Sequence, residues 1–477
     1  MMIIELTNNF INITNVPSQM LKILDEETSY LTSGHNFSPA FINGYWDGKI
    51  HTIKIQRNGD VIIPIGFLNI VKKIIKNNNF SFSLKSSFTE INKKKFNWND
   101  KIILRYYQKE AIEKFCSKPN IGRGILKMPI RSGKTKTAAG IIKRLGAKTL
   151  FIVPSTMLLY QTKESLKTSL PGVRIGLIGD KEASEGDITI ITIQSLSMLH
   201  SKKKNTSKLY LSLINNYDMI IVDEIHKSGK GNVWRKVLLE SKAKYRLGLS
   251  ATVFFDSKKE NETGVIWLRA CCGDIKYEIS TSKLIKDGYL IKQVVELYAI
   301  TKPKLLGEPW SKKLRNEAIY ENEYRNNIIS RLAVRKTMDG LSVLIISNRL
   351  AQIDQISNML TSYRTNHFIL TGTTSKEKRK NFIESFRNGE VKILIGTVFG
   401  EGIDIPELEC VIVAEGGKDI KSTIQRMRNM TLSEGKSKAI LVDFYDTTNR
   451  YFTNHSINRI KTYESEDEFI VKRMWQK

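Results

Sequence analysis

A glycine, a lysine and a threonine in the stretch MPIRSGKT, residues 128–135, have the spacing of a phosphate-binding loop. Gly133 carries no side chain, so backbone N–H groups can come close to phosphate oxygens. Lys134 supplies a positive charge, and the Thr135 hydroxyl is a ligand suited to Mg²⁺. The following segment, TKTAAGIIKRLG, predicts a helix whose N-terminal end also favours anions. The same predicted nucleotide-binding loop includes Arg131 and Ser132.

Two acidic residues end a predicted buried strand in the stretch YDMIIVDEIH. Asp223 can hold Mg²⁺, directly or through water, and Glu224 can orient and deprotonate a water molecule. A strand that ends in surface acids is common, so the pair alone decides little. The order along the chain decides more, because the pair follows Lys134 by 89 residues, as in sheets that place both groups around one Mg²⁺. The sequence therefore predicts hydrolysis of ATP or GTP.

The net charge of the chain is +27, and most of it lies in the middle. Residues 1–100 carry 11 lysines and arginines against 8 acidic residues, and residues 451–477 carry 5 against 4, so residues 101–450 hold +23. A positive field of this size favours a polyanionic partner, most simply nucleic acid, over a merely solubilising surface. The 4 cysteines have no metal-binding spacing, and no apolar run is long enough to span a membrane. The opening residues show no signal-peptide pattern, so we expect a reduced, cytoplasmic protein.

The hydrophobic pattern predicts three folded parts in the 477 residues. Residues 1–97 form a predicted small α+β domain, with turns that favour a hairpin and with the lysine-faced helix IGFLNIVKKIIKNN. Its Trp46 could be a core residue or a wedge, and a core residue is favoured. From residue 98, runs such as TLFIVP, ITIITIQ and YDMIIVDE alternate with longer segments, which predicts a parallel sheet with right-handed crossovers.

A second set of strand runs follows a polar stretch that becomes helical, residues 301–330. These runs are SVLIISN, HFILTG, VKILIGT, CVIVAE and KAILVDF. We therefore predict two α/β lobes in tandem: a nucleotide-binding lobe at residues 98–300, a linker at residues 301–330 and a second lobe at residues 331–477.

Six further stretches fall in a fixed order around these motifs: RYYQKEA (105–111), FIVPSTMLLYQ (151–161), ITIQSL (191–196), LGLSAT (247–252), LIISNR (344–349) and ILIGTVFGEGIDIPEL (393–408). The ordered set resembles superfamily 2 helicases of the DExH kind over about residues 98–450. The pattern F-x-P-x-F-x-x-G-x-W-D-G-K, from Phe37 to Lys49, resembles the N-terminal domain of UvsW-type helicases of T-even phages. The resemblance implies two tandem RecA-like parallel-sheet lobes, preceded by a small α+β domain that binds DNA, with ATP and Mg²⁺ as cofactors.

The resemblance also implies roles for matched positions. Those expected to contact the nucleotide, in the adenine site or from the second lobe, are Arg105, Tyr107, Gln108, Gly402 and Asp404. Those expected along the nucleic-acid backbone are Pro154, Ser155, Thr192, Gln194 and Thr397. Those expected to couple hydrolysis to lobe movement are His226, Ser250 and Thr252. Small hydroxyls and amides contact phosphates without reading bases, which suits a translocating motor. For each hydroxyl taken singly, a turn or helix cap is an equally good interpretation.

The stretch IQRMRNMTL departs from the family's pattern. Such motors end their second lobe with Gln-x-x-Gly-Arg-x-x-Arg. Gln425 is present, but Arg428 stands at the glycine position, and Asn429 and Leu432 stand at the arginine positions. An arginine on the γ-phosphate is worth about 10³- to 10⁵-fold in rate in other nucleotide hydrolases. We predict an active enzyme in which Arg428 supplies this charge, with Arg426 as the next candidate.

The function that the resemblance implies is that of an ATP-dependent DNA helicase or translocase, of a phage, acting on branched or partly single-stranded DNA. Its reactions would be branch migration, fork regression and unwinding of D-loops or R-loops, in recombination, replication and repair. RNA–DNA hybrids are further candidate partners, and the compartment would be the host cytoplasm if the protein is viral. Two alternatives remain: a viral DExH helicase that acts on RNA or releases transcripts, and a nucleic-acid-binding protein with a defective ATPase. A nuclease is disfavoured, because no second acidic cluster stands outside the ATP site.

Overall fold

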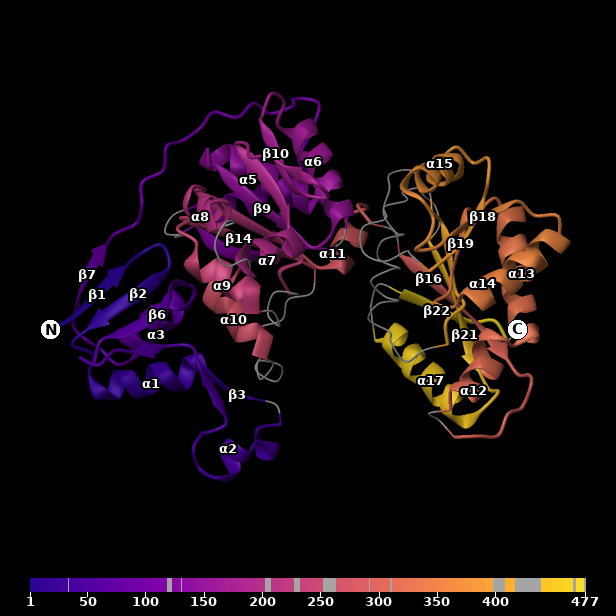
Figure 1. Ribbon diagram of the computed structural model, residues 1–477, viewed down its shortest axis with the longest axis horizontal. Coiled ribbons are helices and arrows are strands. Elements are labelled where there is room, and N and C mark those ends of the chain that lie inside the picture. Colours follow the sequence, from indigo (N-terminus) through magenta and orange to yellow (C-terminus); the bar gives the residue numbers. More distant parts are fainter. Residues whose placement is uncertain are drawn as a thin grey trace. The chain divides into compact units, whose positions relative to one another are not determined.

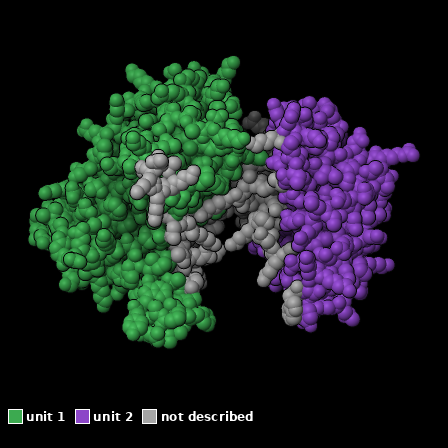
Figure 2. All heavy atoms as spheres, viewed as in Figure 1, with its two compact units in different colours: residues 1–279 green, residues 280–477 purple. Residues whose placement is uncertain are grey.

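The computed structural model describes residues 1–32, 34–117, 122–129, 131–201, 207–226, 232–251, 263–290, 292–308, 311–397, 408–416, 439–465 and 469–475. Contacts within the chain divide it into two compact units, residues 1–279 and residues 280–477 (Figure 2).

The first unit begins with a five-stranded sheet in the order β5-β6-β2-β1-β7 (Figure 1). Alternate residues of β1 are buried, so Met2, Ile4 and Leu6 face a core shared with helices α1 and α3. This arrangement confirms the predicted small α+β fold. The bounds are β1 Met2–Leu6, β2 Phe10–Thr14, α1 Ser18–Thr28, β5 Lys54–Ile55, β6 Val61–Pro64, α3 Leu68–Asn77 and β7 Phe82–Ser86.

A short arm extends from the N-terminal domain after α1, with the helix α2 at its tip (Figure 1). It consists of the paired strands β3 (Ser29–Leu31) and β4 (Lys49–His51), with α2 (Pro39–Ile42) between them. Trp46 is half-buried and its indole N–H donates to the Lys49 carbonyl at 2.7 Å, so it holds a turn of the arm and is neither a deep core residue nor a free wedge. The exposed aromatic side chains of the arm are instead Phe37 and Tyr45, at 87% and 86% exposure.

The N-terminal sheet is joined to the rest of the first unit by polar contacts. The amides of Asn8 and Asn9 donate to the carbonyls of Lys242 and Leu239, both at 2.8 Å. The buried Arg246 donates to the Asn9 side-chain oxygen, also at 2.8 Å. The predicted boundary at residue 97 therefore falls inside one compact unit.

The main sheet of the first unit has eight strands in the order β11-β10-β12-β9-β13-β14-β8-β15. All of its pairs are parallel except β10 with the short β11. Its strands are β8 Arg123–Lys127, β9 Thr149–Val153, β10 Ile175–Gly179, β11 Glu182–Ala183, β12 Ile188–Thr192, β13 Met219–Asp223, β14 Tyr245–Ser250 and β15 Ile275–Glu278. Its helices are α4 Tyr106–Cys116, α5 Lys134–Leu145, α6 Thr156–Ser169, α7 Ile193–Ser201, α8 Ser207–Asn215, α9 Asn232–Glu240 and α10 Thr263–Cys272.

The second unit contains a seven-stranded parallel sheet in the order β18-β19-β17-β20-β21-β16-β22. The five predicted strands of the second lobe are present as β17 Val343–Ile346, β18 His367–Leu370, β19 Ile393–Gly396, β20 Cys410–Val413 and β21 Ile440–Asp446. Its other elements are α11 Thr281–Lys286, β16 Gln293–Ile300, α12 Lys312–Arg315, α13 Glu323–Met338, α14 Leu350–Ser362, α15 Lys376–Arg387, α17 Arg450–Glu464 and β22 Phe469–Arg473. The two sheets confirm the predicted pair of RecA-like lobes.

One boundary of the predicted lobes differs from the structure. The strand β16, which the sequence analysis placed in the first lobe, lies in the second sheet between β21 and β22. An alternating rhythm of strands and helices identifies strands but not the sheet that each one joins. The polar stretch at residues 301–330 becomes helical as predicted, since α13 begins at Glu323.

Candidate functional site

The predicted phosphate loop connects β8 to α5 in the first unit. Gly133 has a φ of +81°, a left-handed conformation that favours glycine. A Cβ at this position would lie 2.2 Å from Nε2 of Gln108, so a side chain here would have to displace the Gln108 amide as well as adopt a strained conformation. Arg131 is also left-handed, with a φ of +61°. Two positions of the loop thus have a left-handed backbone, which residues other than glycine adopt only uncommonly.

The carbonyl of Ser132 is the point at which α4 holds this loop. It accepts hydrogen bonds from the Tyr107 hydroxyl at 2.9 Å and from Nε2 of Gln108 at 2.8 Å. Arg105 donates to the Tyr107 hydroxyl through its side chain and to the Gln108 side-chain oxygen through its backbone N–H. Both ends of the Gln108 amide are therefore engaged with the protein. Its predicted contact with adenine would require these bonds to be exchanged.

Lys134 and Thr135 begin the helix α5, and no side chain caps the helix at Gly133. The uncapped N-terminal end leaves the loop suited to an anion, since the first N–H groups of a helix lack partners within it. Nζ of Lys134 lies 3.5 Å and 3.4 Å from the carbonyls of Met128 and Pro129, which are long and therefore weak hydrogen bonds. These residues fit the phosphates of a nucleotide.

The acidic pair lies at the carboxyl end of the fully buried strand β13. Asp223 is 8% exposed, and its carboxylate accepts a hydrogen bond from the Glu224 N–H at 3.0 Å. Glu224 has a φ of +50°, an uncommon conformation for this residue type that is found most often at functional sites. The strand end therefore presents both carboxylates from a constrained backbone.

A chain of contacts connects the acidic pair to the phosphate loop through Ser250, at the end of β14. Nδ1 of His226 lies 2.8 Å from the Ser250 hydroxyl and 3.3 Å from a carboxylate oxygen of Glu224. The Ser250 carbonyl accepts a hydrogen bond from the Met128 N–H at 2.9 Å. In the sheet, β14 lies between β13 and β8, so the strands that lead to the two motifs are two strand spacings, about 10 Å, apart. The expected link through His226 is thus present as a contact, and its role in coupling stays a prediction.

The candidate backbone-binding residues of the first unit gather at the carboxyl ends of β9 and β12, which are adjacent and parallel. The Ser155 hydroxyl accepts from the Leu158 N–H and caps α6. Nε2 of Gln194 donates to the Pro154 carbonyl at 3.1 Å. The Thr192 hydroxyl donates to Ser195 at 2.9 Å. Turn and cap contacts therefore exist for these groups, and contact with nucleic acid stays a prediction.

The neighbouring strand β10 ends in residues that the sequence analysis did not single out. Asp180 and Lys181 have φ values of +51° and +71°, and the Tyr160 hydroxyl donates to Asp180 at 3.1 Å. A Cβ on Gly179 would lie 3.1 Å from the Ser195 hydroxyl and 3.2 Å from that of Thr192. The sequence feature that could have identified this turn is Gly179-Asp180 directly after an apolar run, since such a dipeptide marks a tight turn at a strand end.

In the second unit, Thr397 follows β19 and its N–H donates to the Leu370 carbonyl at 3.2 Å. The sequence analysis missed a buried polar group centred on Gln352, whose amide donates to the carbonyl of Ile319 and to the side chain of Asn326. The remaining candidate residues lie outside the described residues: Thr252, Gly402, Asp404, Gln425, Arg426 and Arg428.

Three family models match separate parts of the chain. A model for the res subunit of type III restriction enzymes matches residues 101–255, the helicase conserved C-terminal domain matches residues 324–428, and the N-terminal domain of DNA helicase UvsW matches residues 9–85. The protein named "Putative helicase 22" of Sulfolobus islandicus filamentous virus is 31% identical over 396 residues, which cover 77% of this chain and 68% of that protein. The chain belongs to the superfamily 2 helicases.

Two further relatives agree with this placement. The ATP-dependent DNA helicase uvsW of Enterobacteria phage T4 is 21% identical over 494 residues, which cover 93% of each protein. The structure of S. cerevisiae Dbp5 bound to RNA and ADP BeF3 has a TM-score of 0.53 at 18% identity and covers 77% of this chain and 89% of that one, which shows the shared fold. The chain is accordingly an ATP-dependent helicase enzyme.

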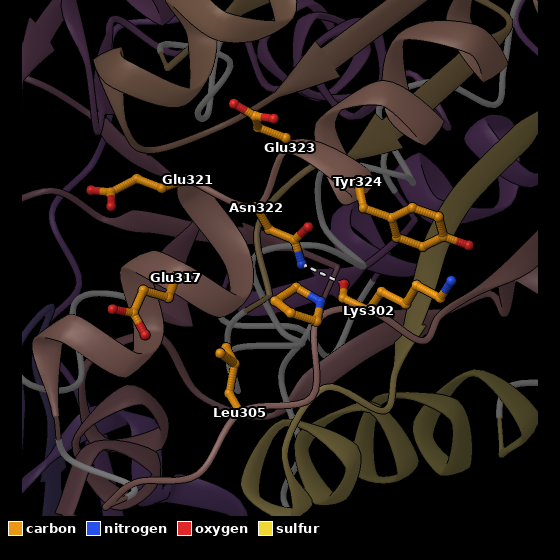
Figure 3. Close-up of a pocket in the computed structure, with 8 residues that line it drawn as sticks. Lys302, Leu305, Glu317, Glu321, Asn322, Glu323 and Tyr324 are labelled. Atoms are coloured by element: carbon orange, nitrogen blue, oxygen red, sulfur yellow. Dashed lines mark hydrogen bonds between the residues drawn. The ribbon is translucent and has the colours of Figure 1, made fainter.

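The second unit also contains a pocket of about 570 Å³ whose lining includes none of the predicted site residues (Figure 3). Asn322 donates to the Lys302 carbonyl at its centre, at 2.9 Å. Its lining is Lys302, Pro303, Leu305, Glu317, Glu321, Asn322, Glu323 and Tyr324. Among the described residues, no helix combines the length and the apolar character that crossing a membrane requires.

Proposed function

We propose that this helicase is an ATP-driven DNA motor that acts on branched DNA. The observation that carries the proposal is the N-terminal match at residues 9–85 to the UvsW domain, together with a T4 relative that aligns over 93% of both proteins. That relative's name describes an ATP-dependent DNA helicase. The UvsW resemblance implies branch migration, fork regression and unwinding of D-loops or R-loops as the reactions. The relatives in two viruses also favour a viral or phage source.

The nucleotide site is proposed to be built mainly from the first unit. Lys134 places its charge on the phosphates, and the hydroxyl of Thr135 and the carboxylate of Asp223 are the Mg²⁺ ligands. Glu224 orients a water molecule and takes its proton. Arg105, Tyr107, Gln108, Arg131 and Ser132 shape the loop and the adenine side, and Gly402 and Asp404 face the nucleotide from the second lobe. When bound, Mg-ATP supplies the phosphoanhydride bond whose cleavage releases the energy for movement.

The coupling is proposed to run from Glu224 through His226 to Ser250 and Thr252. Support comes from the contacts of His226 with both Glu224 and Ser250, at 3.3 Å and 2.8 Å. A change of charge at Glu224 would thus act through His226 on Ser250, at the end of β14. The Ser250 carbonyl accepts a hydrogen bond from Met128, just before the phosphate loop. The nucleic-acid backbone is proposed to lie along Pro154, Ser155, Thr192, Gln194 and Thr397.

The test compares ATP hydrolysis by the purified full-length chain with single-stranded DNA, forked DNA, a four-way junction, RNA and an RNA–DNA hybrid. We expect hydrolysis to be stimulated by DNA, and we expect ATP-dependent unwinding of forks and junctions in preference to linear duplex. Glu224→Gln is the control, and it should bind DNA but neither hydrolyse ATP nor unwind.

Two outcomes would contradict the proposal. Stronger stimulation and unwinding with RNA would favour a transcript-releasing helicase. Tight, salt-sensitive DNA binding without phosphate release on any substrate would favour a binding protein with a defective ATPase.

A further inference from the structure

The exposed face of the helix α3 is basic and has no acidic residue. Lys72, Lys73 and Lys76 are exposed, while Val71, Ile74 and Ile75 are buried in the N-terminal core. Lys72 and Lys76 are four residues apart and so lie on the same side of the helix. Like charges at this spacing slightly destabilise a helix, and an anionic partner would relieve their repulsion.

Three lysines on other helices of this chain have acidic partners within the chain. Lys283, Lys313 and Lys380 each form an ion pair with an acidic residue four positions later, namely Asp287, Glu317 and Glu384. On α3 the positions four residues after Lys72 and Lys73 hold Lys76 and Asn77. Within the described part of the chain, no ion pair is formed by Lys72, Lys73 or Lys76. The ammonium groups of α3 are therefore left for an external partner.

A fourth lysine extends this face onto the main sheet of the first unit. Lys276 lies on β15, the strand paired with β8, and its side chain packs over Gly124. Burial lowers the pKa of the Lys276 ammonium; Asp274 opposes this shift and Lys72 adds to it. Asp274 itself is engaged by Nδ2 of Asn69 at 2.6 Å and by Nε of Arg269 at 3.2 Å. The nearby carboxylate is thus also hydrogen-bonded by Asn69 and ion-paired with Arg269.

The start of α3 is fixed directly to the main sheet's own helices. A Cβ on Gly66 would lie 1.9 Å from the Arg269 carbonyl oxygen and 2.5 Å from that of Ala270, so the backbone passes against the end of α10 with no room for a side chain. Ala270 is fully buried within the N-terminal core. The basic face therefore belongs to the same compact unit as the phosphate loop.

We propose that Lys72, Lys73, Lys76 and Lys276 form a phosphate-binding surface for the double-stranded part of the DNA substrate. Four residues of helix rise about 6 Å, a length over which one DNA strand presents about two phosphates. The exposed residues of α3 are lysines and asparagines, and they include no aromatic ring on which an unpaired base could stack. Single-strand sites combine basic grooves with such rings, so this face fits a duplex, whose bases are already stacked. The inference rests on the proposed function, because it requires a DNA substrate.

The experiment compares two triple variants of the full-length chain. In the first, Lys72→Gln, Lys73→Gln and Lys76→Gln remove three charges from α3. In the control, Lys283→Gln, Lys313→Gln and Lys380→Gln remove the same charge from lysines that already have acidic partners. Fluorescence anisotropy measures the affinity of each for a short blunt duplex and for a single strand, between about 50 mM and 200 mM salt.

We expect the α3 variant to bind duplex at least about tenfold more weakly, with a salt slope shallower by about 2 to 3, because each lost phosphate contact removes about 0.9. Binding of single strands and ATPase stimulated by single strands should stay within twofold of the parent. Arginine at the same three positions should retain the slope, and Lys276→Gln alone should lower it by about 1.

Equal duplex affinities and slopes in the α3 and control variants would overturn the inference, and so would an equal loss of single-strand binding. If the parent chain shows no DNA-stimulated ATPase, the proposed function fails instead. The two failures are therefore distinguishable.

Discussion

At the scale of single residues, the phosphate loop depends on a close contact rather than on charge alone. Gly133 is left-handed and lies against the Gln108 amide, which in turn holds the Ser132 carbonyl. Gly172 is also left-handed, with a φ of +79°, but a Cβ added there would have no atom within 4 Å. Alanine at Gly172 would therefore introduce backbone strain alone. Alanine at Gly133 would introduce the same strain and would also displace the Gln108 amide that holds the loop.

Gly133→Ala should lower the ATPase rate by about 100-fold, because the methyl group displaces Gln108 and with it the loop that holds the phosphates. Gly172→Ala should cost only about 1 kcal/mol of stability through backbone strain and should leave the rate near that of the parent. Steady-state phosphate release and thermal unfolding measure the two effects. Equal rates in the two variants would show that the contact with Gln108 does not position the loop.

At the scale of elements, the strand β4 of the N-terminal arm is held to α1 by a histidine between two acids. Nδ1 of His51 lies 2.7 Å from Asp25, and Nε2 lies 3.1 Å from Asp47. The hydrogen bond with Asp25 is the main cause that raises the pKa of His51, against the effect of burial. A raised folded-state pKa means that the contact stabilises the arm fully below the unfolded value of about 6.5 and is lost as the pH rises through the folded value.

We expect an NMR titration to give His51 a pKa above the ordinary value in the parent chain and a lower one in Asp25→Asn. The change should appear as a shift of the imidazole resonances, since Asp25→Asn removes both the hydrogen-bonded carboxylate and its charge. The same midpoint in both proteins would rule out Asp25 as the cause.

A buried ion pair joins β21 to α17 in the second unit. Nε of Arg459 lies 2.8 Å from Asp443, and the Tyr463 hydroxyl donates to the same carboxylate at 2.8 Å. Both charged side chains are almost completely buried. If either charged side chain were removed, water could therefore not solvate the one that remains.

Asp443→Asn should destabilise this unit by about 3 to 5 kcal/mol, because it leaves the Arg459 charge buried without a counter-charge. Glu464→Gln, which breaks the half-exposed pair with Arg473, should cost less than about 1 kcal/mol. Urea unfolding followed by fluorescence compares the two. A small effect of Asp443→Asn would mean that Arg459 finds other acceptors, such as the Phe444 carbonyl it already contacts.

Elements with a strong local pattern were predictable, and groups defined by tertiary contact were not. The apolar runs of β9, β12 and β13 could be read directly, because a strand buried on both faces has a continuous hydrophobic sequence. The same runs placed Asp223 and Thr192 at strand ends. The sheet that β16 joins, and the buried position of Gln352 in α14, depend on partners far away in sequence. No local periodicity carries that information.

At the scale of the whole molecule, the chain divides its chemistry between two units. The phosphate loop, the acidic pair and His226 belong to the first, while the candidate arginines belong by sequence to the second. Residues 101–450, which include most of both motor lobes, hold +23 of the net charge of +27. A polyanion would therefore meet positive charge on the same parts of the chain that process the nucleotide.

A charge supplied by the second unit would make hydrolysis depend on both units. Arg428→Ala should lower the DNA-stimulated rate of ATP hydrolysis by about 10³-fold or more while leaving nucleotide binding nearly unchanged, because the arginine would act on charge that develops in the transition state. Arg426→Ala should have a smaller effect. Steady-state phosphate release and equilibrium binding of a fluorescent nucleotide separate the two quantities. Near-parental rates in both variants and in the double variant would show that the charge comes from elsewhere, and the absence of arginine at positions 429 and 432 would then mark a different transition-state contact in this helicase.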